Sequence, residues 1–202
     1  MVLVKICGVT TVDDAVLAVR AGAGAIGLNF YPRSPRHVGI ETAGSICTAL
    51  PAHVWRVGVF VDTARQEVNA IAERLGLDTL QFHGDEPPEY CRDWAQRTIK
   101  ALRVRDADTL RRSRDYAVDF ILADAYVEGL AGGTGQSVPR EWLAGVDPAH
   151  LILAGGLTPD NVAAVVRQVR PMGVDVASGV ESMAGRKDPE RLRRFIANAQ
   201  NA

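Results

Sequence analysis

One carboxylate in this chain stands at the end of a short apolar run and a little ahead of a glycine-rich turn. Asp124 closes the run 120–124, and the turn occupies residues 132–135. A buried strand that ends in an acid, beside backbone N–H groups with no side chain over them, is how a barrel enzyme holds a phosphorylated substrate against a proton donor. A surface connection would look the same in isolation, so the rest of the chain must decide between the two interpretations.

A thiol and two further glycine turns follow other apolar runs in the same way. Cys7 ends the first run of the chain, where the alternative is a small buried thiol with a packing role. The loops after the seventh and eighth strands of a barrel are the usual phosphate site of that fold. A tight turn would explain each glycine turn alone, but three of them on one rim favour a phosphate site. The candidate phosphate-binding residues are Gly133, Thr134, Gly135, Gly155, Gly156, Ser178 and Gly179.

Three polar residues fall within or at the end of runs that resemble buried strands. Gln81 and His83 belong to the run 79–83, and Asp175 lies in the run 174–177. Polar groups inside a barrel must be hydrogen-bonded or used, so we expect these residues to contact substrate. His83 fits equally well as a packing residue with satisfied hydrogen bonds.

No metal ion or other cofactor is expected. The cysteines at 7, 47 and 91 show no metal-ligand spacing, and neither do the histidines and carboxylates. There is no dinucleotide fingerprint, and no hydroxyl nucleophile has an evident base. What remains is a barrel that holds a phosphorylated small molecule between a thiol and a carboxylate, a pair suited to moving protons in a sugar phosphate isomerisation.

The composition is that of an ordinary globular protein, with 202 residues of which 47% are hydrophobic and 23% are charged. A formal net charge of −1 gives no electrostatic reason to expect binding to nucleic acid or to a membrane surface. An odd number of cysteines without a signal peptide is typical of a reducing compartment. We therefore expect a cytoplasmic protein with a small-molecule substrate, and the sequence leaves open whether it is a monomer or a homodimer.

Apolar, β-rich runs alternate with amphipathic helical patterns along the whole chain. The runs are continuously apolar, as expected for a parallel sheet covered by helices. Eight such units predict an α/β fold, a single-domain (β/α)8 TIM barrel over residues 1–202, with an open doubly wound sheet as the alternative. Thr11 and Thr158 are placed to cap the helices that follow them. The expected strands are 2–6, 25–30, 54–61, 79–83, 98–102, 120–124, 151–154 and 174–177, and the expected helices are 12–21, 64–75, 88–96, 107–116, 159–169 and 189–199.

Motifs near the ends of these runs resemble those of the phosphoribosylanthranilate isomerase family, and the resemblance covers essentially the full chain. No single motif decides it, but their order along the expected strands is specific. The motifs are KICGVT at 5–10, SPR at 34–36, QFHG at 81–84, Asp124 with GGTG at 132–135, AGGL at 154–157 and DVASGVE at 175–181.

This resemblance implies an isomerase of tryptophan biosynthesis. The implied reaction is an Amadori rearrangement of N-(5′-phosphoribosyl)anthranilate to 1-(2-carboxyphenylamino)-1-deoxyribulose 5-phosphate. Asp124 is implied as the general acid that opens the furanose ring, and Cys7, as a thiolate, is implied as the base that removes the C2′ proton. The thiolate would need activation by helix N-termini or by a cationic substrate. Arg36 is implied as the clamp on the anthranilate carboxylate, since a planar guanidinium matches a planar carboxylate.

Two rival interpretations stay open at this point. The histidine-pathway phosphoribosyl isomerase performs the same rearrangement on a larger, bisphosphorylated substrate. The glycine turns here gather after the sixth to eighth strands, which favours a single phosphate. A non-catalytic phosphosugar-binding barrel would keep the glycine turns and have no use for Cys7 together with Asp124.

Overall fold

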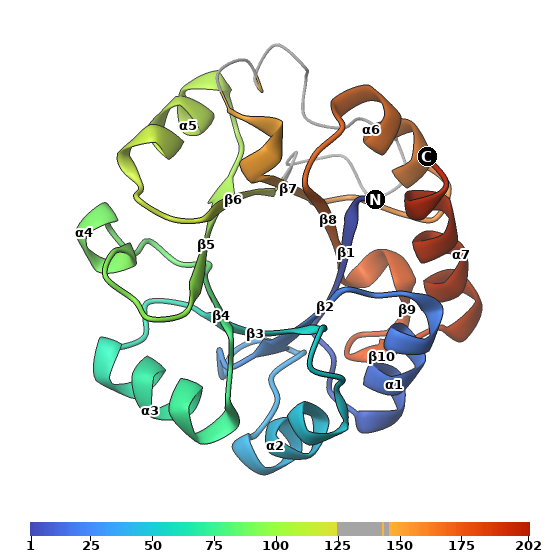
Figure 1. The fold of residues 1–202 in the computed structure, drawn as a ribbon, viewed down its shortest axis with the longest axis horizontal. Helices are drawn as coiled ribbons and strands as arrows, with labels where there is room; N and C mark the ends of the chain where they lie inside the picture. The colour runs from blue at the N-terminus through green and yellow to red at the C-terminus, as the bar shows by residue number, and fades with distance from the viewer. Residues whose placement is uncertain (125–142, 144–145) are drawn as a thin grey trace.

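Eight parallel strands close into a barrel in the computed structural model, which describes residues 1–124, 143 and 146–202. Each strand pairs with its neighbour in sequence, and β1 pairs with β8 to complete the ring (Figure 1). The predicted (β/α)8 barrel is thereby confirmed, and the open doubly wound sheet is wrong. The strands are β1 (Leu3–Cys7), β2 (Ala25–Asn29), β3 (Trp55–Phe60), β4 (Thr79–Phe82), β5 (Arg97–Arg103), β6 (Phe120–Asp124), β7 (Leu151–Ala154) and β8 (Gly173–Val176).

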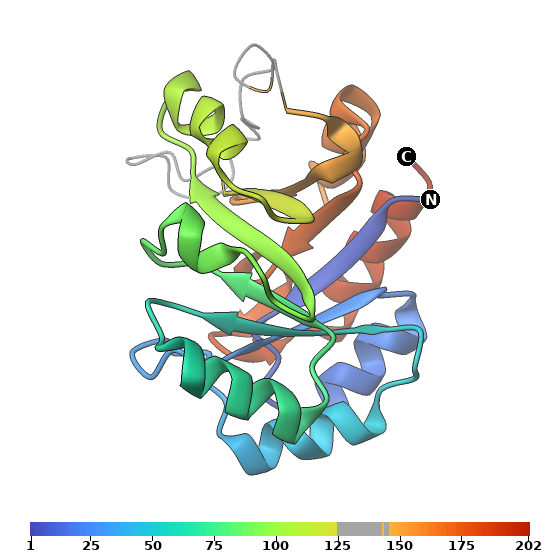
Figure 2. The same cartoon turned by 60° about the vertical axis from the view of Figure 1, so that its left-hand side comes forward.

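Helices surround the barrel on its outside (Figures 1 and 2). They are α1 (Val12–Ala21), α2 (Ile40–Ala49), α3 (Arg65–Leu75), α4 (Pro88–Cys91), α5 (Ala107–Arg111), α6 (Val162–Val169) and α7 (Pro189–Gln200). A hairpin of β9 (Glu181–Met183) and β10 (Arg186–Lys187) follows β8, and the sequence predicted neither this hairpin nor α2. In the described part of the chain no helix has the length and apolar character needed to cross a membrane. The cytoplasmic location stays a prediction.

Alternation along the strands explains why polar side chains gather at one end of the barrel. A small apolar cluster that includes Val57, Ile99, Leu122 and Ile152 fills the inside of the barrel. Side chains two residues apart on a strand point to the same face, so Asp124 shares the inward direction of Leu122. The strand runs are therefore apolar in the middle and polar where they end, which sets the functional groups above a packed floor.

Two helices end earlier than predicted for local reasons. The helix predicted over 88–96 stops at Cys91, because Arg92 is extended and Asp93 takes a positive φ of 61°. The pattern over 107–116 continues beyond α5 only as a short 3₁₀ helix, Arg112–Asp115.

The caps predicted for two helices had different outcomes. Thr11 accepts a hydrogen bond from the Asp14 N–H at 3.2 Å, so its role as the cap of α1 is confirmed. Thr158 instead heads a turn: its carbonyl accepts from the N–H groups of Asn161 and Val162, and α6 begins only at Val162 with Asn161 as the cap residue. The prediction that Thr158 caps a helix starting at residue 159 is wrong.

Candidate active site

The C-terminal ends of the strands form the mouth of the barrel, where a cavity of about 240 Å³ opens. Cys7 reaches this cavity from β1, Asp124 from β6, Asp175 from β8, and His83 from the residue after β4. The structure thus brings together residues that lie far apart in the sequence. Among the predicted site residues, those that line the cavity are Cys7, Arg36, His83, Asp124, Gly155, Gly156, Asp175, Ser178 and Gly179.

The thiol of Cys7 lies next to the ammonium group of Lys5. A Cβ atom on Gly27 would stand 2.9 Å from Cys7 Sγ and 3.2 Å from Lys5 Nζ, so the bare backbone of Gly27 leaves room for both groups. Burial raises the pKa of the Cys7 thiol, while Lys5 lowers it and Asp175 raises it. The balance leaves the pKa above the usual value for a thiol, which disfavours the thiolate that the predicted base role requires.

Lys5 is fully buried and forms an ion pair with Asp175, with 2.8 Å between Nζ and Oδ1. The register of β1 and β8 sets the two residues opposite each other. Burial lowers the pKa of Lys5, but the negative charge of Asp175 and the neighbouring Cys7 raise it by more, and the pKa stands above its usual value. Asp175, predicted as a substrate-binding residue, therefore also neutralises a buried lysine.

Arg36 is held by Glu181 in a two-pronged ion pair. Its Nε lies 2.9 Å from Oε1 of the carboxylate, and its Nη2 lies 2.6 Å from Oε2. Lys187 donates to the same carboxylate at 2.9 Å and to the carbonyl oxygen of Cys7 at 2.6 Å. Burial opposes ionisation of Glu181, but the hydrogen bonds from Arg36 and Lys187 outweigh it and hold the pKa of this carboxyl below its usual value. The guanidinium is thus fixed at the wall of the cavity.

His83 connects a buried amide to Asp124. Its Nδ1 lies 2.9 Å from Gln81 Nε2, and its Nε2 lies 3.5 Å from Asp124 Oδ2. An amide N–H donor at Nδ1 leaves the proton of a neutral imidazole on Nε2, facing the carboxylate. Gln81 is fully buried, and its Oε1 has no hydrogen-bond partner among the described residues. Gln81 lies behind His83 and orients it, whereas the sequence predicted a substrate contact from Gln81 itself.

Glycine turns border the cavity on the side of β7 and β8. Gly155 and Gly156 have φ of 82° and 63°, in the left-handed region that favours glycine. Within the described residues their N–H groups donate to no backbone carbonyl, which leaves them available to an anion. A Cβ on Gly156 would meet nothing within 4 Å, whereas a Cβ on Gly179 would collide with the carbonyl oxygen of Leu157. Gly156 therefore borders open space, and Gly179 is a glycine because the backbone packs closely there.

The third predicted turn, with Gly133, Thr134 and Gly135, lies outside the described residues. In the residues that are described, no three or more His, Cys, Asp or Glu side chains form a group that could hold a metal ion. The described side chains around the cavity offer a thiol, carboxylates and an imidazole, which are the groups that most often transfer protons in active sites.

A family model described as N-(5′-phosphoribosyl)anthranilate (PRA) isomerase matches residues 4–198. The chain belongs to the PRA isomerase family. The resemblance seen in the sequence motifs is thereby confirmed, as are the expectations of an isomerase and of a role in tryptophan biosynthesis.

Relatives and solved structures of PRA isomerases match over the whole chain. The enzyme of that name from Trichlorobacter lovleyi is 49% identical over 206 residues, with 100% of both chains covered. A crystal structure of phosphoribosyl anthranilate isomerase in complex with reduced 1-(o-carboxyphenylamino)-1-deoxyribulose 5-phosphate is 38% identical, with a TM-score of 0.88 and both chains fully covered. Monomers generated from the dimeric Thermotoga maritima enzyme give a TM-score of 0.88 at 36% identity, again over 100% of both chains. Both monomeric and dimeric PRA isomerases thus resemble this chain.

Three charged residues at the PRA isomerase site were missed by the sequence interpretation. Lys5 shares the inward side of β1 with Cys7, two residues away, and this spacing was the signal that could have found it. Glu181 and Lys187 come from the unpredicted hairpin after β8. Their role depends on Arg36, which is 145 residues away from Glu181 in the sequence. No local pattern reveals a contact of that kind.

Proposed function

We propose that this PRA isomerase catalyses the Amadori rearrangement of N-(5′-phosphoribosyl)anthranilate to 1-(2-carboxyphenylamino)-1-deoxyribulose 5-phosphate, with Asp124 as general acid and Cys7 as general base. The observation that carries the proposal is that Cys7, Asp124 and the turn at 155–156 line one cavity. An acid, a base and an anion site around one small molecule are what ring opening and proton transfer on a sugar phosphate require. The similar crystal structure that holds a reduced form of the product supports this substrate class.

Ring opening is the first step. Asp124 transfers a proton to the furanose ring oxygen, the bond from C1′ to that oxygen breaks, and the nitrogen lone pair forms the C1′=N bond of a protonated Schiff base. His83 Nε2 lies 3.5 Å from one oxygen of Asp124 and helps to hold the carboxyl group at the cavity. Asp124 must carry its proton when substrate binds, and it becomes a carboxylate once the ring has opened.

Deprotonation at C2′ is the second step. The positive charge of the Schiff base acidifies the C2′ hydrogen, so a modest base is sufficient. Cys7 must first lose its own proton, and the adjacent ammonium of Lys5 stabilises the thiolate that results. Removal of the C2′ proton gives an enolamine. Addition of a proton at C1′ and loss of the O2′ proton then give the ketone, and the two released protons replace those that were used.

Substrate binding is divided between the two sides of the cavity. The N–H groups at Gly155 and Gly156 are suited to the phosphate, together with Ser178 and Gly179 and the predicted turn at 133–135. Arg36 is suited to the anthranilate carboxylate, with Glu181 holding its guanidinium in place. Asp175 and His83 line the space between these ends, and Gln81 sets the orientation of His83.

The test is a fluorescence or absorbance assay of the purified chain on N-(5′-phosphoribosyl)anthranilate. We expect turnover at full rate after treatment with a chelator and dialysis. We expect kcat to fall by roughly 10²–10⁴ in Cys7→Ser and in Asp124→Asn, as is typical for a positioned acid or base. A folded wild-type protein without turnover would refute the proposal, and so would a rate restored only by a divalent metal or a nicotinamide. Turnover of the bisphosphorylated histidine-pathway substrate alone would favour the rival isomerase.

A further inference from the structure

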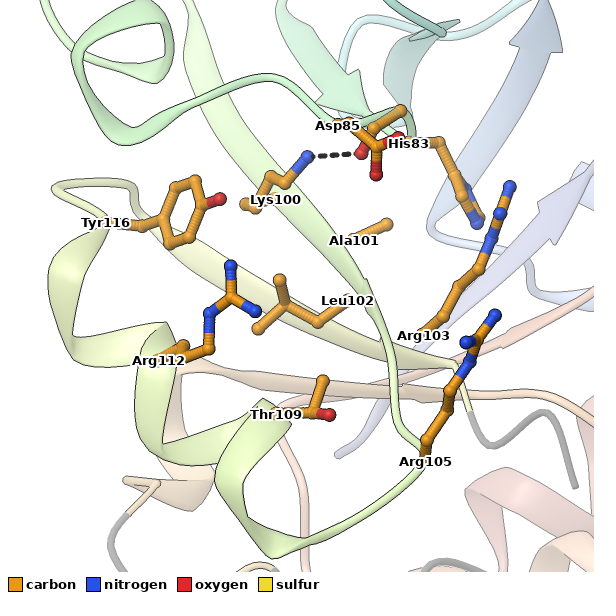
Figure 3. A pocket seen from close by; sticks show the side chains of 11 residues that line it. His83, Asp85, Lys100, Ala101, Leu102, Arg103, Arg105, Thr109, Arg112 and Tyr116 are labelled. Atoms are coloured by element: carbon orange, nitrogen blue, oxygen red, sulfur yellow. Dashed lines mark hydrogen bonds between the residues drawn. The ribbon is translucent and has the colours of Figure 1, made fainter.

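A second cavity, of about 490 Å³, lies beside the candidate active site, between the ends of β4 and β5 and the segment that contains α5. His83 lines both this cavity and the smaller one that holds Cys7 and Asp124, so the two spaces adjoin at one side chain. Nothing in the proposed reaction uses the larger space. Figure 3 shows its walls, with Arg103 and Arg105 on one side and Lys100, Tyr116 and Arg112 on the other.

The charges around this second cavity are mostly positive. Lys100 is buried and neutralised by Glu86, with 2.6 Å between Nζ and Oε2, so it adds no free charge. Arg103, Arg105 and Arg112 are exposed at the wall, and within the described residues none of them takes part in an ion pair. Among the described residues that line the cavity, Asp85 is the one carboxylate, and it faces three guanidinium groups.

These arginines come from three different segments and reach one space. Arg103 ends β5, Arg105 follows it in the loop, and Arg112 begins the 3₁₀ helix after α5. Arg111, their neighbour, behaves differently: it pairs with Asp108 and does not line the cavity. The three arginines therefore share the lining of one cavity, which exposure on a solvated basic face alone would not produce. Guanidinium groups at the wall of a concave surface are the usual means of binding a phosphate group.

We propose that this arginine pocket, lined by Arg103, Arg105 and Arg112, is a second phosphate-binding site, and that the barrel binds sugar bisphosphates whose other phosphate occupies the glycine turns after β7 and β8. The inference goes beyond the proposed function, since N-(5′-phosphoribosyl)anthranilate carries one phosphate. The proposed ligand class is a five-carbon sugar with a phosphate at each end, because the proposed substrate is a five-carbon sugar phosphate and His83 lines both cavities.

Competitive inhibition by a matched pair of ligands tests the site. Ribulose 5-phosphate and ribulose 1,5-bisphosphate differ only in the second phosphate. We expect the bisphosphate to bind more tightly to the wild type by about tenfold or more, as one charge-assisted contact would provide. In Arg105→Ser/Arg112→Ser this advantage should disappear, while the inhibition constant of ribulose 5-phosphate and the KM for N-(5′-phosphoribosyl)anthranilate stay unchanged. Arg111→Ser is the matched control and should keep the full advantage.

Equal binding of the two ligands by the wild type would overturn the proposal, as would an equal loss in Arg111→Ser, which would show a diffuse effect of net charge. A raised KM for N-(5′-phosphoribosyl)anthranilate in the double variant would place the pocket within the ordinary substrate site and would also overturn it. Calorimetric titration with inorganic phosphate tests whether each site binds a free anion without the sugar. We expect two binding sites for phosphate in the wild type and one in the double variant. Failure of the proposed function would instead abolish turnover, and the affinities of the same two ligands for the wild type and the variants would then be compared by calorimetric titration.

Discussion

Lys5 and Asp175 form an ion pair inside the barrel, with Nζ 2.8 Å from Oδ1, and the same ammonium group borders the Cys7 thiol. Removing one partner alone would leave an uncompensated buried charge, which is strongly destabilising. The pair must therefore be altered as a unit to learn what it does for Cys7. Of the two charges, Lys5 lowers the pKa of the Cys7 thiol, which is the effect that the proposed base role needs.

The variant Lys5→Met/Asp175→Asn should raise the pKa of the Cys7 thiol further. Burial already raises it, and of the two charges the lowering effect of Lys5 is larger than the raising effect of Asp175. Alkylation of Cys7 by iodoacetamide, followed against pH by mass spectrometry, measures the pKa. We expect the wild type to react slowly at neutral pH and the rate to rise at alkaline pH. The curve of the variant should lie at higher pH, and a curve that stays in place or moves to lower pH would show that Lys5 does not act on the thiol.

Arg36→Lys keeps the charge and loses the planar fork. If Arg36 binds the anthranilate carboxylate, kcat/KM should fall. The fall should correspond to a loss of about 1–3 kcal/mol in transition-state stabilisation, the value for one charged hydrogen-bonding contact. A substrate analogue without the aromatic carboxylate should be much less affected. Glu181→Gln is the companion variant, since it loosens the guanidinium and keeps Arg36. Equal losses for both substrates in Arg36→Lys would show that the residue only supports the structure.

Gly156→Ala should raise KM for the phosphorylated substrate with little change in kcat, because a methyl group would stand in the open space beside the N–H groups that are suited to phosphate. Gly76→Ala is a matched control: Gly76 has a φ of 61° against 63° for Gly156 and equally open surroundings, but it ends α3. Both variants should lose similar stability from backbone strain. If KM were unchanged in Gly156→Ala, the phosphate would have to bind elsewhere. Gly179 is unsuitable for this test because any side chain there meets Leu157.

Glu181 should make the stability of the protein fall in acid. Its pKa is lower in the folded state than usual, so its contribution is fully present above the unfolded-state pKa of roughly 4.3 and is lost as pH falls through the folded value. Urea unfolding at a series of pH values should give a clearly larger free energy of unfolding for the wild type than for Glu181→Gln near neutral pH. The difference should shrink below about pH 4. Glu73 is exposed on α3, so the free energy of unfolding of the control variant Glu73→Gln should match that of the wild type at every pH. A difference that is constant with pH would contradict the assignment.

Much of the barrel and part of the site could be predicted because the information is local. Cys7 and Asp124 end apolar runs, and the end of a parallel strand is where a barrel builds its site. The missed helix α2 has Gly44 and Ser45 in its middle, so its amphipathic pattern is weak. The early stop of α4 depends on the positive φ of Asp93, a conformation that its sequence does not signal.

The charged support of the site could not be predicted because its contacts join distant parts of the chain. Arg36 was expected to face substrate alone, and its pairing with Glu181 forms only once the fold brings the hairpin after β8 next to Arg36. Gln81 and His83 were expected to act alike, and both point to the same face of the sheet, but Gln81 lies within β4 and is buried whereas His83 follows the strand and lines the cavity. Local patterns therefore predicted Cys7 and Asp124, whereas the contacts of Arg36 and His83 became visible only in the folded structure.

The most direct test of the central claim is the kinetic isotope effect with substrate deuterated at C2′. Ring opening by Asp124 precedes removal of the C2′ proton by Cys7, so each variant should slow a different step. We expect a large primary isotope effect on kcat in Cys7→Ser, where proton removal limits the rate, and a small one in Asp124→Asn, where ring opening limits it. A large effect in Asp124→Asn with a small one in Cys7→Ser would mean that the two roles are reversed, and near wild-type turnover in either variant would remove that residue from the mechanism.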